Sequence, residues 1–254
     1  MKLKHRADVL LCERGLAPSR ARAQSLIMAG EVFAGGKRID KPGMLLSPDI
    51  EIGVVPRRRF VSRGGDKLEG ALTSFGDRFR SLSGVVAVDV GASTGGFTDC
   101  LLQRGAAKVY AVDVGFGQLD ERLRQDQRVI SRERTNARDL QATDFEEPID
   151  LVVVDASFIG LGKLTAAIGR ILKHGGDLVA LVKPQFEAGR EEASKGRGVI
   201  RDDAVREAAI ASARTALVED GFRIVAEADS EVLGPKGNRE RFVHATRVTP
   251  PQKG

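Results

Sequence analysis

Tryptophan is absent from this chain of 254 residues, tyrosine occurs once, and aromatic residues make up only 5% of the whole. Proteins that read single-stranded nucleic acid usually stack its bases on several aromatic side chains. We therefore expect any nucleic acid to be recognised through its folded shape and its phosphates.

Cysteine and histidine are also scarce. The two cysteines, Cys12 and Cys100, form neither a CxxC pair nor a disulfide framework, and there are only three histidines. We predict no metal site, and this cysteine usage fits a reducing compartment.

Long apolar runs are missing as well. The run from Leu178 to Val182 has the length of a strand, whereas a membrane-spanning helix needs about 20 apolar residues. Residues 1–15 carry charges throughout, which argues against a secretory signal. We expect a cytoplasmic protein without a membrane partner, and nothing in the sequence demands more than a monomer.

Positive charge is concentrated near the amino terminus. Residues 1–67 contain 14 Lys and Arg against 7 Asp and Glu, whereas the remaining residues contain 26 against 28. A compact basic module beside a nearly neutral one is typical of a grip on nucleic acid. A merely solvated basic surface is the alternative.

The first 60 residues have the pattern of a small α+β domain, with two short helices followed by short strands. Ser19 is a good N-cap for the second helix, and Gly35-Gly36 supply the positive φ angles of a tight hairpin. The predicted helices span residues 6–14 and 19–30, and the predicted strands lie at residues 32–34, 37–39 and 50–52.

A larger domain follows a stretch rich in proline, arginine and glycine at residues 54–65, which we interpret as a linker. The predicted division is a small domain at 1–60, a junction at 61–67 and a large domain at 68–250. Strands alternating with helices predict a Rossmann-like α/β fold, with a doubly wound, mostly parallel sheet and an antiparallel edge. The predicted strands are residues 85–90, 108–113, 128–131, 150–155, 177–183, 222–228 and 241–247.

The first of these strands runs into a glycine-rich turn that begins at Gly91 and precedes a helix. Such a turn lets a ligand approach the backbone at the edge where open α/β sheets bind nucleotides. Asp113, 22 residues after Gly91, ends the next strand, where its carboxylate can accept hydrogen bonds from a ribose. Ser93 replaces the glycine that makes room for a pyrophosphate, which favours S-adenosylmethionine over a dinucleotide. A purely structural turn is the alternative.

The same turn also matches the G-x-S-x-G nucleophile elbow, with Asp155 and His244 following in the order of the α/β-hydrolases. We disfavour a hydrolase, because no strand and helix precede this strand to supply an oxyanion loop. His244 is then an ordinary strand residue.

Four charged residues complete the predicted crevice. Asp155 and Lys183 each follow a buried strand, so both are expected at the edge that carries Gly91, although each could be a structural strand end. Lys67 precedes the large domain and Glu240 lies in its last loop. Two ammonium groups and two carboxylates suit transfer of a group onto a sugar hydroxyl.

Methyl transfer to such a hydroxyl needs a base that removes its proton. A partly buried lysine beside a second cation loses its own proton more readily than a free lysine, which makes Lys183 the candidate base and Lys67 the second cation. Asp155 would orient Lys183. Glu240 would steady the hydroxyl or Lys67.

Several motifs carry a resemblance to known proteins: Arg6-Ala7-Asp8, Ser19-Arg20, Lys41-Pro42-Gly43, Ser62-Arg63-Gly64-Gly65-Asp66-Lys67-Leu68, Asp89-Val90-Gly91-Ala92-Ser93-Thr94-Gly95-Gly96-Phe97-Thr98, Glu133-Arg134-Thr135-Asn136, Asp155-Ala156-Ser157-Phe158-Ile159, Lys183-Pro184-Gln185-Phe186-Glu187 and Gly237-Asn238-Arg239-Glu240. The first 60 residues resemble the S4-type RNA-binding domain, and the rest resembles the FtsJ-like ribose methyltransferases. In this order the two are similar to the TlyA family of ribosomal-RNA cytidine-2'-O-methyltransferases, some members of which carry the name haemolysin. The resemblance covers essentially the whole chain.

The resemblance implies S-adenosylmethionine as cofactor, and ribosomal RNA and ribosomal subunits as partners. It also implies a catalytic tetrad of Lys67, Asp155, Lys183 and Glu240. Two arginines flank Glu240, where an apolar or aromatic neighbour would be unsurprising. The expected cofactor-binding residues are Asp89, Gly91, Ser93, Thr94, Gly95, Gly96, Phe97, Asp113, Asn136 and Asp155.

Contacts with RNA phosphates are expected mainly from the basic module, and such contacts position RNA without reading its bases. The loop at residues 185–201 either closes over the substrate or is a plain surface loop. Two other functions stay open: a ribosome-binding or assembly factor without catalysis, and a membrane-lytic protein, for which we find neither a span nor a long amphipathic helix. The expected RNA-binding residues are Arg6, Ser19, Arg20, Arg22, Lys37, Arg38, Lys41, Arg57, Arg58, Arg59 and Arg63.

Overall fold

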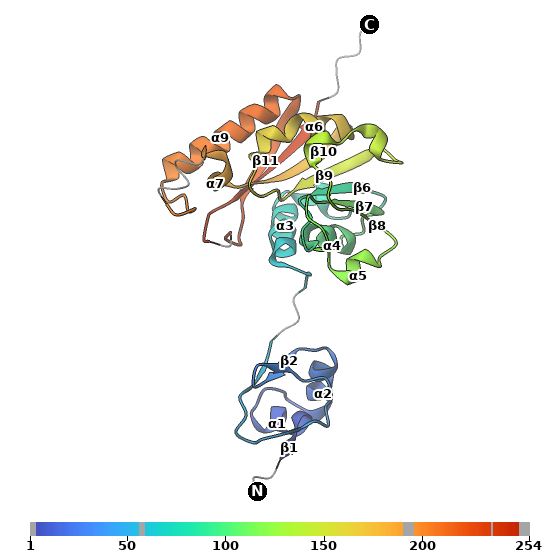
Figure 1. The fold of residues 1–254 in the computed structure, drawn as a ribbon, viewed down its shortest axis with the longest axis vertical. Coiled ribbons are helices and arrows are strands. Elements are labelled where there is room, and N and C mark those ends of the chain that lie inside the picture. The colour runs from blue at the N-terminus through green and yellow to red at the C-terminus, as the bar shows by residue number, and fades with distance from the viewer. Residues whose placement is uncertain (1–3, 56–58, 190–195, 235, 249–254) are drawn as a thin grey trace. The chain divides into compact units, whose positions relative to one another are not determined.

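A computed structural model describes residues 4–55, 59–189, 196–234 and 236–248 (Figure 1). The chain folds as two compact units, which divide after Arg59. The predicted junction at residues 61–67 overlaps helix α3 (Arg63–Ser74), which begins in the second unit.

Local chemistry explains this early helix start. Ser62 is the N-cap of α3, and its hydroxyl accepts a hydrogen bond from the backbone N–H of Gly64 at 3.3 Å. The glycine pair is not a flexible hinge. A Cβ atom on Gly65 would lie 2.3 Å from the ring of Phe60, so glycine is needed for close packing.

The first unit confirms the predicted helices and hairpin. Helices α1 (Ala7–Glu13) and α2 (Arg20–Met28) pack beside a three-stranded sheet in the order β3 (Lys37–Arg38), β2 (Val32–Ala34), β5 (Ile52–Val54). Gly35 and Gly36 have φ angles of 55° and 74°. The sequence did not predict a second small sheet, in which β1 (His5–Arg6) pairs with β4 (Leu45–Leu46).

The second unit is a doubly wound α/β domain around one seven-stranded sheet, in the order β11-β12-β10-β9-β6-β7-β8. The first five strands along the chain lie parallel, and β12 and β11 add the predicted antiparallel edge. Strand β10 begins five residues earlier than predicted, with a register shift between Leu172 and Asp177. The strands are β6 (Val86–Val90), β7 (Lys108–Val112), β8 (Val129–Arg132), β9 (Ile149–Val154), β10 (Leu172–Val182), β11 (Phe222–Asp229) and β12 (Arg241–Arg247).

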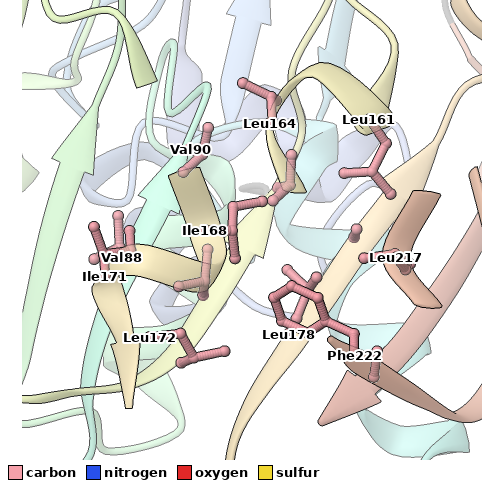
Figure 2. Close-up of a cluster of buried hydrophobic side chains, with 14 of the residues drawn as sticks. Val88, Val90, Leu161, Leu164, Ile168, Ile171, Leu172, Leu178, Leu217 and Phe222 are labelled. Atoms are coloured by element: carbon pink, nitrogen blue, oxygen red, sulfur yellow. The ribbon is translucent and has the colours of Figure 1, made fainter. Parts of the chain in front are cut away.

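Helices cover both faces of this sheet, and alternate residues of each central strand point to opposite sides. In β9, Val152 and Val154 pack with α6 (Thr165–Ile171) and α9 (Asp203–Glu219). Figure 2 labels Ile168 and Ile171 of α6 and Leu217 of α9 in the same cluster. Leu151 and Val153 pack with α3 and α4 (Gly96–Gln103) on the other face. The short helices are α5 (Glu121–Arg124), α7 (Pro184–Glu187) and the 3-10 turns η1 (Gly76–Phe79), η2 (Ala137–Asp139), η3 (Ala142–Asp144) and η4 (Leu161–Lys163).

Among the described residues, no helix has both the length and the apolar character needed to cross a membrane.

Candidate active site

A cleft of about 680 Å³ opens at the carboxyl edge of the parallel strands. It is lined by Gly91 after β6, Asp113 after β7, Asn136 after β8, Asp155 after β9 and Lys183 after β10. The volume is in the usual range for cofactor sites, and the location is the one at which open α/β sheets bind nucleotides.

The glycine loop after β6 lies directly against the chain that follows β9. Gly91 has a φ angle of 84°, and a Cβ atom on it would lie 3.0 Å from both Ala156 Cα and the carbonyl oxygen of Asp155. Gly95, with a φ angle of 91°, is the N-cap of α4, and a Cβ atom there would lie 2.3 Å from Leu123. Glycine is favoured at both positions, and at Gly91, which lines the cleft, the missing side chain leaves bare backbone.

Asp113 joins the first two loops of the cleft. Its carboxylate accepts hydrogen bonds from the backbone N–H groups of Ser93, at 2.8 Å, and Gly115, at 2.7 Å. Each carboxylate oxygen keeps a second lone pair that can accept from a ribose hydroxyl. Gln118, which sequence reasoning missed, lines the cleft and accepts a hydrogen bond from the hydroxyl of Ser93 at 3.1 Å.

The other expected cofactor residues divide into two groups. Ser93, Thr94, Gly96 and Phe97 line the cleft. Asp89 and Gly95 are not among the lining residues and support the loop from behind.

Asp89 is fully buried beneath the glycine loop. One carboxylate oxygen accepts from the backbone N–H and the hydroxyl of Thr98, at 2.9 and 2.7 Å, and the other has no hydrogen-bond partner among the described residues. Burial raises the pKa of Asp89 to about 7, because the hydrogen bonds from Thr98 only partly offset the loss of solvation.

Asp155 and Lys183 form an ion pair inside the cleft. Lys183 Nζ lies 2.7 Å from Asp155 Oδ1 and donates hydrogen bonds to the Asp155 carbonyl oxygen, at 3.2 Å, and to Ser157 Oγ, at 2.8 Å. The Lys183 side chain is buried, and these three contacts hold its terminal nitrogen in one orientation. Ser157 is a second contact that sequence reasoning did not assign.

Lys67 and Glu240 form a separate, buried ion pair at 2.5 Å. Neither residue lines the cleft, and Glu240 Oε1 has no hydrogen-bond partner in the described part of the chain. We predicted that Lys67 acts on Lys183 as a second cation. Instead each lysine contacts its own carboxylate, so the four charges form two pairs.

An exposed phenylalanine that lines the cleft packs against a second phenylalanine. Phe158 is 91% exposed, has a φ angle of 66° and lines the cleft, and its ring centroid lies 5.3 Å from that of Phe186. Lys183 Nζ lies 6.0 Å from the Phe186 centroid. Composition gave no reason to expect an aromatic pair here. The one signal in the sequence was the position of Phe158, three residues after Asp155. A positive φ angle on an exposed phenylalanine is strained and suggests a functional constraint.

The hydrolase interpretation is wrong. Asp155 contacts Lys183, and the hydroxyl of Ser93 donates to Gln118. His244 Nε2 lies 2.8 Å from Asp177, which precedes Lys183 by six residues, or about 20 Å of strand. The three residues of a triad are therefore not in contact.

In the first unit, Arg6 and Arg20 converge on the buried carboxylate of Asp8. Arg6 donates to both carboxylate oxygens, at 3.0 and 3.1 Å, and Arg20 donates to one at 3.2 Å. The Arg6 guanidinium holds the pKa of Asp8 well below its usual range, and Gln24 adds a hydrogen bond at 2.9 Å. Arg6 also lines an open surface hollow together with Lys41.

The remaining residues predicted to contact RNA differ in whether their side chains are exposed and in whether they already contact another residue. The hydroxyl of the exposed Ser19 accepts from the backbone N–H of Arg22 as the N-cap of α2, as predicted. Arg38 pairs with Asp40 at 2.8 Å. The side chains of Arg22, Lys37, Lys41, Arg59 and Arg63 are exposed. The predictions for Arg57, Arg58 and the centre of the 185–201 loop, including Lys195, lie outside the described residues.

Comparison with known proteins identifies the family of each unit. The model of the FtsJ-like methyltransferase family matches residues 60–247, and that of the S4 domain matches residues 6–52. The 16S/23S rRNA (cytidine-2'-O)-methyltransferase TlyA of Mycobacterium tuberculosis is 42% identical over 96% of this chain and 90% of its own. Hemolysin A of Brachyspira hyodysenteriae is 42% identical over 94% of this chain and 98% of its own.

A solved structure agrees along nearly the whole chain. The protein described as "Putative hemolysin from Streptococcus thermophilus" superposes with a TM-score of 0.72 and 42% sequence identity, over 98% of this chain and 90% of its own. The two family models together and the relatives match along nearly the whole chain, and they indicate the same class of protein as the cleft with its glycine loop and Lys–Asp pair. The chain belongs to the FtsJ-like methyltransferase family and, within it, to the family of TlyA and Hemolysin A.

Proposed function

We propose that the protein transfers the methyl group of S-adenosylmethionine to the ribose 2'-hydroxyl of a cytidine in ribosomal RNA. The observation that carries this proposal is the Asp155–Lys183 ion pair, which lies in the same cleft as the glycine loop and Asp113. The names of the full-length TlyA relatives support the choice of substrate.

The residues of the cleft fit S-adenosylmethionine. Gly91 leaves bare backbone beside the chain after β9, and Asp113 keeps lone pairs for the ribose hydroxyls. Asn136 lines the same cleft and would lie near the adenine. The sulfonium centre of the cofactor supplies an activated methyl group when it is bound.

Lys183 is our candidate for the base. As the new O–CH₃ bond formed, the S–CH₃ bond would break to leave a neutral thioether, and the 2'-hydroxyl proton would pass to Lys183 in its neutral amine form, after the ammonium group of the ion pair had released a proton to solvent. Asp155 and Ser157 hold that amine in one orientation, which is the contribution that positioning makes to catalysis.

Lys67 and Glu240 are proposed as the second part of the site. Their burial keeps the Lys67 ammonium fixed against one carboxylate oxygen of Glu240. A fixed pair of charges contributes to catalysis without reorganisation during the reaction.

The nucleobase has a natural place at the mouth of the cleft. A cytidine whose ribose reaches Lys183 must leave its stack, and unstacked bases bind favourably on aromatic rings. Phe158 presents such a ring, supported by Phe186 from behind. The basic S4-type unit would add phosphate contacts through Arg6, Arg20 and Lys41.

Transfer of labelled methyl from S-adenosylmethionine to purified small subunits, large subunits and free ribosomal RNA tests the proposal. Label mapped to a cytidine ribose, and lost in Lys183→Ala, is the expected result. Lys173→Ala is the matched control, because Lys173 lies on the same strand but at its other end, paired with Asp150. Absence of label from every RNA substrate would contradict the proposal.

A further inference from the structure

The position of Glu240 depends on the turn that joins β11 to β12, residues 230–240, which we call the Glu240 turn. Within this turn, the backbone N–H of Ser230 donates to the Glu240 carbonyl oxygen at 2.9 Å, and that of Gly234 donates to the Asn238 carbonyl oxygen at 3.0 Å. These contacts close the turn on itself. Its middle is held by Asn238, whose side chain accepts from the backbone N–H of Ile200 at 2.9 Å and donates to the Gly198 carbonyl oxygen at 2.8 Å.

Arg206, on α9, contacts both ends of the Glu240 turn. Its Nε donates to the carbonyl oxygen of Arg239, directly before Glu240, at 3.1 Å. Its Nη2 pairs with the carboxylate of Asp229, directly before the turn. The remaining nitrogen donates to Glu207 at 2.9 Å.

The guanidinium of Arg206 is buried, with the residue only 4% exposed. A buried charge costs free energy unless hydrogen bonds replace its hydration, so its presence here calls for a reason beyond helix stability. Arginine suits the task because its rigid fork of N–H donors fixes more than one acceptor at once.

The same network explains the two arginines that flank Glu240. Arg239 turns outward to Asp203, at 3.2 Å, and Arg241 pairs with Asp229 at 2.8 Å. Their side chains therefore face α9 and β11, whereas Glu240 between them turns inward to Lys67. Successive side chains of an extended chain point to opposite sides, so the two arginines face away from the buried glutamate between them.

We propose that Arg206 is a positioning residue that clamps both ends of the Glu240 turn and thereby holds Glu240 against Lys67. This inference rests on the proposed function, in which the Lys67–Glu240 pair serves methyl transfer. Arg206 acts through Glu240.

Arg214 provides a matched control on the same helix. It lies two turns further along α9 and pairs with Glu227 of β11 at 3.0 Å, and its contacts do not reach the Glu240 turn. Substitution of either arginine by methionine removes an α9–β11 ion pair, and of the two only Arg206→Met also removes a hydrogen bond to the residue before Glu240. Asp229 keeps Arg241 as a partner in Arg206→Met, so no carboxylate is left alone.

The experiment measures the single-turnover rate of methyl transfer at saturating cofactor and RNA, with cofactor affinity and thermal midpoint for each variant. Arg206→Met is expected to lower the rate by about ten- to a hundredfold, the scale that misplacement of a group by about 1 Å produces. Cofactor affinity should stay within twofold of wild type. Arg206→Lys should recover part of the rate, because an ammonium group can satisfy one end of the clamp, and Arg214→Met should keep the full rate.

A double-mutant cycle with Glu240→Gln distinguishes two reasons for a lower rate in Arg206→Met: loss of the position of Glu240, or general destabilisation of the domain. If Arg206 works through Glu240, Arg206→Met has no further effect in the Glu240→Gln background. Independent losses that multiply, or a wild-type rate in Arg206→Met, would overturn the inference. Should Arg206→Met fail to fold, Asp229→Asn releases the other contact of the clamp and enters the same cycle. Full activity in Glu240→Gln alone would instead refute the proposed role of Glu240.

Discussion

The carboxylate of Glu240 contacts the ammonium group of Lys67 at 2.5 Å, across 173 residues of sequence. This buried contact joins the first helix of the second unit to the turn before its last strand. Neither residue can be replaced alone without leaving a charge buried and unpaired.

Breaking the Lys67–Glu240 pair should therefore have two separable consequences. Lys67→Met and Glu240→Gln are each expected to destabilise the second unit, with Lys67→Met costing about 3–5 kcal/mol because it strands a buried carboxylate. The double variant should recover stability relative to Lys67→Met and stay inactive in methyl transfer. Thermal unfolding and rate measurements on the three variants check this, and recovered activity in the double variant would show that the pair is only structural.

Phe158 should matter for RNA and not for the cofactor. Phe158→Ala is expected to lower kcat/KM for RNA by roughly 10- to 100-fold, the value of one base stacked on an aromatic ring. Phe158→Tyr should retain most of the activity, because the ring is kept. Titration of S-adenosylmethionine should give the wild-type affinity in both variants. Equal losses in alanine and tyrosine would point away from stacking.

For the RNA affinity of an Asp8→Ala variant, the change in net charge and the loss of arginine orientation predict opposite effects. Removal of an acidic residue from a basic surface would raise RNA affinity if charge alone decided it. Because Asp8 orients Arg6 and Arg20, we expect Asp8→Ala to lower RNA affinity by about tenfold, the scale of one charge-assisted hydrogen bond. RNA titrations at several salt concentrations provide the measurement, and tighter binding by the variant would contradict it.

Asp89 should make the stability of the second unit depend on pH. Burial raises its pKa to about 7, with the nearby charges of Asp155 and Asp113 acting in the same direction, whereas an aspartate in an unfolded chain titrates near pH 4. The folded state therefore holds a proton that the unfolded state has lost, and stability falls as the pH rises from about 4 through about 7. We expect the thermal midpoint of wild type to drop relative to Asp89→Asn between pH 5 and pH 8. An equal change in both proteins would remove Asp89 as the cause.

Much of the fold could be predicted from the sequence, because its signals are local. Hydrophobic runs such as residues 150–154 predict strands buried on both faces, and Ser19 or the Gly35–Gly36 pair predict the end of one element and the start of the next. Motif resemblance extended this to the cofactor loop and the four charged residues. The prediction of a linker was wrong at residues 64–65, which lie in helix α3. Glycine occurs both where a chain must be flexible and where it must pack closely, and the sequence does not distinguish the two.

The sequence by itself determined which chemical groups this protein has: a glycine loop, Asp155 and Lys183 after two strands, Lys67 near the start of the large domain and Glu240 before the last strand. The tertiary structure chose among the pairings that the sequence left open: Glu240 contacts Lys67, and Lys183 contacts Asp155. Lys67 and Glu240 meet through packing of segments 173 residues apart, and no local pattern encodes that contact. The same holds for Arg206, whose sequence position on α9 looks like that of any helical arginine. Its two contacts with the Glu240 turn arise only when α9 packs beside the strand edge.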